Sequence, residues 1–432
     1  MERNALSFID LFSGCGGLSL GLLKSGWKGL FAIEQNPDAF ETLKHNLVEG
    51  TEDYRPRYHW PENLEIKPYE ISSFFEQNID LLKRMRGKVN LVAGGPPCQG
   101  FSFAGKRTGK DPRNELFKLH LDIVDVLQPE LVILENVHGI EVAFKNNTEE
   151  SKPNKSYANL IASLLRVHGY QVQQFIIRAV DFGVPQLRPR YFTIGVRIDI
   201  SQKLPQIDFK ERIYRSREKF LSKHGLPVDR PITVSEAISD LSTSNKTFKD
   251  CTDVDSPSGF KEVVYEGPIT HYQKLMHQEM DGKALNSMRL VNHRPDTIKR
   301  FMSIQNSCRK GVQLSAEDKE RFGIKKTAIV PLSPDKPSHT LTTLPDDLIH
   351  YSEPRVHTVR EYARLQSFPD WFEFKGKFTT GGSRRKHECP RYTQVGNAVP
   401  PLLAEAIGLV LYEYLAQGMS CALPNENKRM MS

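Results

Sequence analysis

The chain has 432 residues, 39% of them hydrophobic, and a net charge of +7 with a pI of about 8.9. This length predicts two or three domains with a sizeable core. The sequence has no run of about 18 apolar residues, so no membrane-spanning helix is predicted. Residues 1–12 lack the pattern of a signal peptide. We therefore expect a cytoplasmic protein without a membrane partner. The mild positive charge does not by itself decide between nucleic acid and other partners.

Residues 1–199 alternate strand-like and helix-like segments. Apolar strands separated by amphipathic helices are typical of an α/β fold with a parallel, doubly wound sheet. Strands are predicted at 8–12, 29–34, 89–95, 131–136, 171–180 and 190–197, and helices at 18–26, 39–47, 116–127 and 157–170.

The texture changes at about residue 200, where Lys, Arg, Ser, Asp and Pro become frequent and periodicity weakens. We interpret 200–355 as a separate, loop-rich domain inserted into the first. Residues 356–432 return to the first domain, with a predicted helix at 357–369 and a turn and apolar helix at 394–416. The six cysteines, at 15, 98, 251, 308, 389 and 421, form no CxxC pair. Their scatter favours reduced thiols and no metal site.

A glycine-rich turn, SGCGG, follows the first predicted strand. Phe12 ends that strand, where its ring would stack on a nucleobase, and Glu34 ends the next, where its carboxylate would reach ribose hydroxyls. The spacing predicts an adenosine cofactor, and the absence of GxGxxG argues against NAD. The alternative is a purely structural turn.

The segment GGPPCQGFS follows the third strand. Ligands bind at the carboxyl edge of open α/β sheets, so Cys98 would face a crevice. A rigid turn around a thiol is typical of a nucleophile, which must be placed accurately. The alternative is a buried structural cysteine.

Two further motifs carry ionisable groups. Glu135 ends the apolar strand LVILEN, where burial would raise its pKa and keep it protonated; the alternative is an exposed strand end. In QLRPR, Gln186, Arg188 and Arg190 alternate and so share one face of an extended segment. Two arginines on one face suit a phosphate, a carbonyl or a glutamate, or else form a solvated basic edge.

These motifs together carry a resemblance. DLFSGCGG, the strand end at Glu34, GGPPCQGFS, ENV, QLRPR, TVREYARLQSFP and QVGNAVPP occur in this order. Through them the chain resembles the DNA (cytosine-5) methyltransferases over nearly its whole length outside 200–345. The resemblance implies a Rossmann-like fold that uses S-adenosylmethionine and releases S-adenosylhomocysteine, with a cytosine flipped out of duplex DNA.

The resemblance also implies roles by position. Cys98 would add to C6 of cytosine, and Glu135 would hold a proton at N3. Arg188 and Arg190 would support Glu135, the base carbonyl and a nearby phosphate. Contacts to DNA or to the flipped base would come from Gln99, Ser102 and Gln186. The cofactor pocket would be formed by Phe12, Gly14, Gly16, Glu34, Glu70, Ile71, Pro96, Leu116, Asn397 and Val399.

Two positions depart from the family pattern. Glu70 stands where an Asp usually precedes Ile71, and Asn90 stands where an Asp usually opens the strand before the cysteine turn. Both departures concern only the corresponding contacts and leave the cofactor assignment intact.

The resemblance implies that 1–199 binds cofactor, that 200–355 recognises the DNA target and that 356–432 completes the catalytic domain. By analogy with single-domain relatives, we expect a monomer paired with a restriction endonuclease that shares its site. Two other hypotheses are a tRNA-directed enzyme of the same chemistry and a non-catalytic DNA-binding protein on the same fold.

Overall fold

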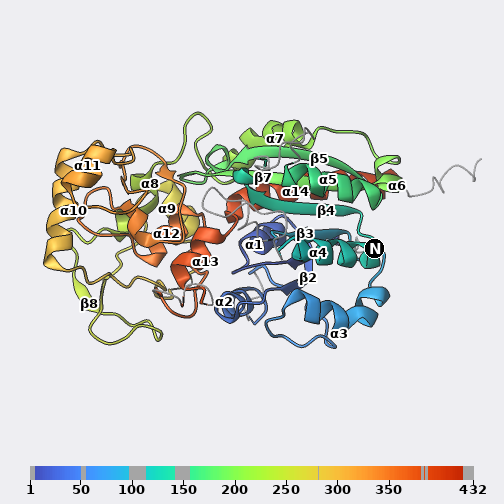
Figure 1. Ribbon diagram of the computed structural model, residues 1–432, viewed down its shortest axis with the longest axis horizontal. Helices are drawn as coiled ribbons and strands as arrows, with labels where there is room; N and C mark the ends of the chain where they lie inside the picture. The colour runs from blue at the N-terminus through green and yellow to red at the C-terminus, as the bar shows by residue number, and fades with distance from the viewer. Residues whose placement is uncertain are drawn as a thin grey trace, which may run out of the picture.

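The computed structural model describes residues 5–49, 55–96, 113–141, 156–280, 282–380, 384 and 388–421. The chain forms two lobes that lie side by side, with α13 (Arg391–Asn397) between them (Figure 1). We call them the sheet lobe, which holds the large sheet, and the insert lobe, which holds the elements from α8 (Val234–Ile238) to α12 (Val359–Leu365).

A six-stranded mixed sheet forms the centre of the sheet lobe. Its four strands from β2 to β4 are parallel, and β7 runs antiparallel between β4 and β5. In spatial order the strands are β2 (Lys28–Ile33), β1 (Ser7–Leu11), β3 (Leu91–Gly94), β4 (Leu131–Val137), β7 (Pro189–Arg197) and β5 (Tyr170–Arg178).

The predicted α/β fold is thus confirmed, but the expectation of a wholly parallel sheet is wrong for β7. Residues 179–188 join β5 to β7, and they form only the short helix η2 (Ala179–Phe182) and the short strand β6 (Gln186–Leu187). A parallel pair needs a crossover of a dozen or more residues. A connection this short therefore returns the chain antiparallel to β5.

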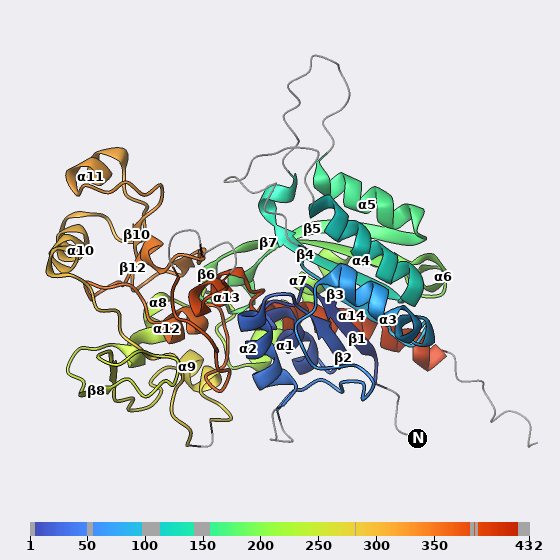
Figure 2. The same ribbon diagram turned by 60° about the horizontal axis from the view of Figure 1, so that its bottom comes forward.

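Helices cover both faces of the sheet, as the two views show (Figures 1 and 2). Two apolar cores lie between these layers and the sheet. One face packs against α3 (Ile71–Arg84), α4 (Arg113–Leu127) and α5 (Tyr157–Val167). The other packs against α1 (Gly17–Lys24), α7 (Phe209–Lys223) and α14 (Pro401–Cys421).

Two of these elements need comment. The sequence analysis did not predict α3, although it buries Ile71, Phe74, Leu81 and Leu82 on one side. The helical segment Arg391–Gly418, which spans α13 and most of α14, is long and apolar enough to cross a membrane. Its most apolar 18 residues have a mean hydropathy of 1.4, but 78% of them are buried within the protein. Its apolar character is explained by packing in the core of the sheet lobe.

Close packing of α1 on α14 joins the two ends of the chain. A Cβ on Gly21 would lie 2.3 Å from the Ala404 Cβ, and one on Gly17 would lie 2.3 Å from the Val399 carbonyl oxygen. Neither position can hold a larger residue without displacing backbone. The first glycine turn and the C-terminal block therefore meet at the same edge of the sheet.

The insert lobe contains short helices and two-stranded ribbons. Part of it has a core of its own, formed by Phe301, Ile304, Leu314, Ile329, Ile349 and Val356. Its other elements are β8 (Phe248–Asp250), β9 (Lys261–Val263), α9 (His271–Met276), α10 (Pro295–Ser307), α11 (Ala316–Arg321), β10 (Val330–Pro331), β11 (Ser338–His339) and β12 (Leu348–Ile349).

The lobes do not divide at the residues expected from composition. Helix α7, expected in the inserted domain, packs on β5 and α14 in the sheet lobe, while α12, expected in the returning segment, packs on α8 in the insert lobe. Charge and weak periodicity misled the prediction for α7. Its outer face is strongly charged, but it buries Phe209, Ile213, Phe220 and Leu221.

Candidate active site

A pocket lies at the carboxyl edge of β1 to β4, with a volume of about 340 Å³. This is the edge at which open α/β sheets bind ligands, and the volume lies in the range of small-molecule sites. The lining comes mainly from the glycine turn, the ends of β2 and β4, the turn after β3, and α13 with the residues after it. The start of α3 and one residue of α4, Leu116, also contribute.

The glycine turn and Glu34 form one wall. Gly14 N donates to Glu34 Oε2 at 2.9 Å, and Asn36 N donates to Glu34 Oε1 at 2.7 Å. Each carboxylate oxygen keeps a lone pair for a further donor. Phe12 has φ +62° and Gly14 φ +56°. A phenylalanine rarely adopts this left-handed conformation, and here it ends β1 at the pocket.

Eight of the ten residues predicted for the cofactor line this pocket: Phe12, Gly14, Glu34, Ile71, Pro96, Leu116, Asn397 and Val399. Gly16 and Glu70 do not. Gly16 caps α1 with φ +94°. Glu70 caps α3, accepting hydrogen bonds from Ser72 Oγ and, at 3.0 Å, from Ser73 N. Both act on the lining indirectly, by starting the helices that carry it.

Glu135 lies at the end of β4, in the pocket lining and 9% exposed. Arg190 Nε lies 2.6 Å from its Oε1, yet within the described part of the chain neither atom has a hydrogen-bond partner of good geometry. Burial raises the pKa of Glu135, and the charge of Arg190 opposes that rise only in part. The fold therefore favours the protonated acid more than water does.

The turn after β3 passes over this acid. A Cβ on Gly95 would lie 3.4 Å from Glu135 Oε2, and Gly95 and Pro96 both line the pocket. The chain then leads toward Cys98. Cys98, Gln99 and Ser102 lie outside the described residues.

Arg188 and Gln186 do not occupy the positions expected of them. Arg188 is 2% exposed and Gln186 is fully buried, and neither lines the pocket. Arg188 donates to the carbonyl oxygens of Leu341, at 3.0 Å, and Gly396, at 2.6 Å. Gln186 Oε1 accepts from Leu341 N at 2.8 Å, and its amide nitrogen donates to Gln366.

This difference has a clear physical cause. The prediction assumed an extended segment with one open face. In the structure β6 pairs with β11, and the insert lobe covers the face on which Gln186 and Arg188 lie. Their side chains join the sheet lobe, the insert lobe and the end of α13. A direct contact of Gln186 with DNA stays a prediction.

Several lining residues were not predicted, notably Asp10, Cys15, Cys389 and Gln394. Asp10, Cys15 and Gln394 stand inside the quoted motifs, but nothing marked their side chains. Asp10 is fully buried on β1, and Ser19 Oγ donates to its Oδ2 at 2.5 Å, while Oδ1 has no hydrogen-bond partner among the described residues. Burial raises its pKa to about 7.

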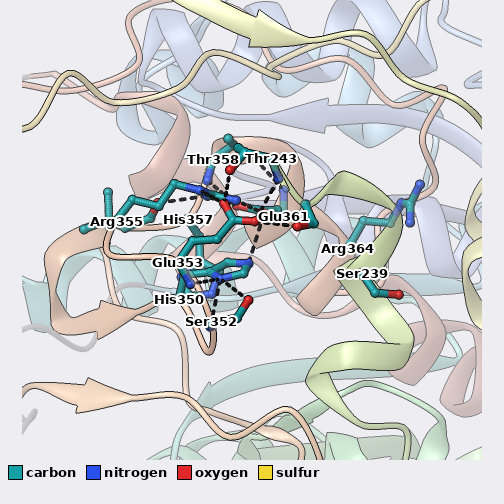
Figure 3. A network of polar contacts seen from close by, with 12 residues as sticks. Ser239, Thr243, His350, Ser352, Glu353, Arg355, His357, Thr358, Glu361 and Arg364 are labelled. Carbon is teal, nitrogen blue, oxygen red and sulfur yellow. Dashed lines mark hydrogen bonds and ion pairs between the residues drawn. The ribbon is translucent and has the colours of Figure 1, made fainter. Parts of the chain in front are cut away.

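A second polar cluster lies in the insert lobe, away from the pocket (Figure 3). Arg355 donates to both oxygens of Glu361 at 2.7 Å and to Glu353 at 2.6 Å. Glu361 also accepts from Thr358 N at 2.7 Å and so closes the capping box of α12. His350 Nδ1 accepts from the backbone N–H of Ser352 and Glu353. Arg355, Glu353 and Glu361 satisfy one another in this cluster, whereas His350 Nε2 lies 3.5 Å from Glu361 Oε1. The cluster joins α12 to its own lobe.

No group of three or more His, Cys, Asp or Glu side chains among the described residues could hold a metal ion. The model of the C-5 cytosine-specific DNA methylase family matches residues 6–413. The chain therefore belongs to this family, and it is a DNA cytosine-5 methyltransferase.

Named relatives agree with this family. The Type II methyltransferase M.DdeI of Desulfomicrobium norvegicum is 31% identical over 407 residues, covering 93% of this chain and 87% of the relative. M1.HphI of Haemophilus parahaemolyticus is also 31% identical, covering 93% and 86%. An E. coli prophage protein described as a DNA modification methyltransferase superposes with a TM-score of 0.64 at 26% identity, covering 95% of this chain and all of the other.

Proposed function

We propose that this enzyme transfers a methyl group from S-adenosylmethionine to C5 of a cytosine in a specific duplex DNA sequence, through a covalent bond from Cys98 to C6. The observation that carries this proposal is Glu135, a buried acid with a raised pKa at the edge of the pocket. It lies beneath the turn that leads to the one cysteine flanked by two prolines and a Gln-Gly-Phe-Ser sequence.

The pocket suits S-adenosylmethionine. Phe12 offers a ring for the adenine, and the free lone pairs of Glu34 suit the ribose hydroxyls. Ile71, Pro96, Leu116 and Val399 give apolar walls, and Asp10 Oδ1 is a buried acceptor without a partner. Bound there, S-adenosylmethionine supplies an electrophilic methyl group.

The protein residues would make the base reactive. C5 of cytosine is a poor nucleophile in an aromatic ring. When the Cys98 thiolate bonds to C6 and Glu135 donates a proton to N3, the ring electrons move to C5. After methylation, the C5 proton passes to solvent, the C6–S bond breaks and releases the thiolate, and N3 returns its proton to Glu135. The base must leave the helix to reach this site.

Arg190, Arg188 and Gln186 would take three different roles. Arg190 touches Glu135 and would support it and the base carbonyl. Arg188 would act as a positioning residue, because its guanidinium holds the carbonyls of Gly396 and Ala398 beside the pocket residue Asn397. Gln186 would hold Arg188 and Leu341 in register.

The insert lobe would read the DNA sequence, since base contacts in the major groove come from elements placed beside the catalytic pocket. The two relatives named above are Type II methyltransferases. We therefore infer that the enzyme is cytoplasmic, acts as a monomer and protects DNA from a restriction endonuclease with the same target.

Methyl transfer from labelled S-adenosylmethionine to duplex DNA, with tRNA as the competing substrate, tests this proposal. We expect labelling of DNA only, and methylation sequencing of the product would give the target.

Cys98→Ala should abolish transfer while S-adenosylmethionine still binds. A duplex with 5-fluorocytosine at the target should form a complex that survives denaturation, because fluorine cannot leave as a proton does. Labelled tRNA, or transfer by Cys98→Ala, would overturn the proposal.

A further inference from the structure

Arg391 begins α13, the helix that carries Gln394 and Asn397 into the pocket lining. Its side chain is fully buried and does not line the pocket. A buried guanidinium needs several acceptors, because removing its charge from water costs several kcal/mol. The origin of those acceptors shows what holds the helix.

The acceptors come mainly from the insert lobe. Arg391 Nη1 and Nη2 donate to the two carboxylate oxygens of Asp253 at 2.5 and 2.9 Å. Nη2 also donates to Asp255 Oδ2 at 2.7 Å, and Nη1 donates to Ser287 Oγ at 2.8 Å. Asp253 and Asp255 lie between β8 and β9, and neither of them lines the pocket.

A closed ring of hydrogen bonds fixes this arrangement. Asp255 Oδ2 also accepts from Gly376 N at 2.9 Å, and Arg391 Nε donates to Gly376 O at 2.9 Å. The guanidinium lies 4.2 Å from the centre of the Phe378 ring. The N–H and the carbonyl oxygen of Gly376 are thus both held by the ion pair between Arg391 and Asp255.

The far end of the seven-residue helix is held by Arg188, which donates to Gly396 O. Between the two ends, Gln394 Oε1 accepts from Thr42 Oγ1 at 2.7 Å, and Gln394 O accepts from Cys15 Sγ at 3.6 Å. The position of α13, which forms this wall of the pocket, therefore depends on a buried arginine at each end. At its first residue it depends also on the carboxylates of Asp253 and Asp255 in the insert lobe.

We propose that Arg391 is a positioning residue through which the Asp253–Asp255 loop of the insert lobe sets the cofactor-side wall of the pocket. The proposal rests on the proposed function. Its consequence is that a change in the insert lobe, at a residue that touches no part of the pocket, weakens S-adenosylmethionine binding. The linkage between two sites of this kind is typically 5- to 150-fold in affinity.

The test uses Asp253→Asn in the full chain, which keeps the side chain's size and removes its charge. Isothermal titration should show the Kd for S-adenosylmethionine rising about tenfold, while kcat at saturating cofactor and the Kd for target DNA stay within twofold. Arg391→Lys should give a smaller rise, because an ammonium keeps the charge but cannot serve Asp253, Asp255 and Gly376 together. In an Arg391→Gln background, Asp253→Asn should add nothing further.

Asp240→Asn is the matched control. Asp240 is also a buried aspartate of the insert lobe paired with a buried arginine, Arg364, at 3.2 Å. It should lower the melting temperature and leave the cofactor Kd within twofold. A cofactor Kd unchanged in Asp253→Asn, or raised equally in Asp240→Asn, would overturn the positioning role. Failure of the wild-type protein to bind S-adenosylmethionine would instead overturn the proposed function on which it rests.

Discussion

Two buried glutamate–arginine pairs, one in each lobe, share the same chemistry and differ in the state the fold favours. In the insert lobe, Arg355, His350 and the Thr358 N–H surround Glu361. Burial alone would raise the pKa of Glu361, but the charge and hydrogen bonds of Arg355 hold it well below its ordinary value. In the sheet lobe, Arg190 makes one close contact with Glu135, and burial leaves its pKa raised.

The difference teaches that an ion pair does not by itself decide the charge of a buried acid. The number of donors around the carboxylate decides it, because each one stabilises the ionised form. Glu361, with several donors, stabilises the fold in its ionised form, whereas Glu135, with one close contact, holds a proton more readily than a free glutamate does. Four changes test this contrast.

The largest effect is expected from Glu135→Gln. The amide keeps the shape of the side chain but cannot give up a proton, so methyl transfer should slow by about 10²- to 10⁴-fold. The free energy of unfolding should fall less than in Glu361→Gln, because Glu135 has one close contact, with Arg190, whereas Glu361 accepts hydrogen bonds from both Arg355 and Thr358. Single-turnover transfer and urea unfolding measure the two quantities. A rate within tenfold of the wild type would remove Glu135 from the chemistry.

Glu361→Gln should show the opposite profile. Removing one partner of a buried pair costs about 3 kcal/mol, while the rate per folded molecule should be unchanged. Because the folded-state pKa of Glu361 is lowered, its stabilisation is present above its ordinary pKa of 4.5 and is lost as the pH falls further. The difference from wild type should therefore shrink in acid. An equal difference at pH 4 and pH 7 would contradict this account.

Asp10→Asn extends the comparison to a third buried acid with an unpartnered oxygen. Burial raises the pKa of Asp10 from 3.8 to about 7, so the folded state binds the proton more tightly than the unfolded chain. Stability should fall as the pH rises from about 4 to about 7. The asparagine variant should lack this part of the slope and be more stable than the wild type at pH 8. Denaturation across this pH range would show whether the two slopes differ.

The smallest effect is expected from Thr358→Ala, which removes the cap of α12 at the edge of the Glu361 cluster (Figure 3). Loss of a capping side chain costs about 1 kcal/mol, and the rate should not change. Thr270→Ala, which removes the same kind of cap from α9 in the same lobe, is the control. Thermal melting should show similar losses, and a rate loss in Thr358→Ala alone would tie the cluster to catalysis.

The sequence was most informative where the local pattern and the site coincide. The apolar strands and glycine turn predicted the sheet edge, and eight predicted residues line one pocket there. The direction of β7 was predicted wrongly, because periodicity shows which face of a strand is buried and carries no direction. The buried role of Gln186 depends on β11, which is far away in the sequence.

The Glu361 cluster was invisible for a related reason. HYSEPRVHT contains mostly polar residues and resembles an exposed turn. Burial of His350, Glu353 and Arg355 is possible only because each finds its partners at once. Such mutual satisfaction is a property of the folded arrangement. The partners of Arg391 were missed in the same way, since Asp253 lies well over one hundred residues before it.

The separate core of the insert lobe has an evolutionary consequence. The segment from His293 to Val356 folds around its own apolar cluster, and its ends meet, since Val356 N donates to His293 Nε2 at 3.2 Å. A unit with its own core and adjoining ends tolerates changes of length, except where β11 pairs with β6 and Leu341 binds Arg188 and Gln186. Under the proposed function, we expect related enzymes with other target sequences to differ in this segment outside those contacts.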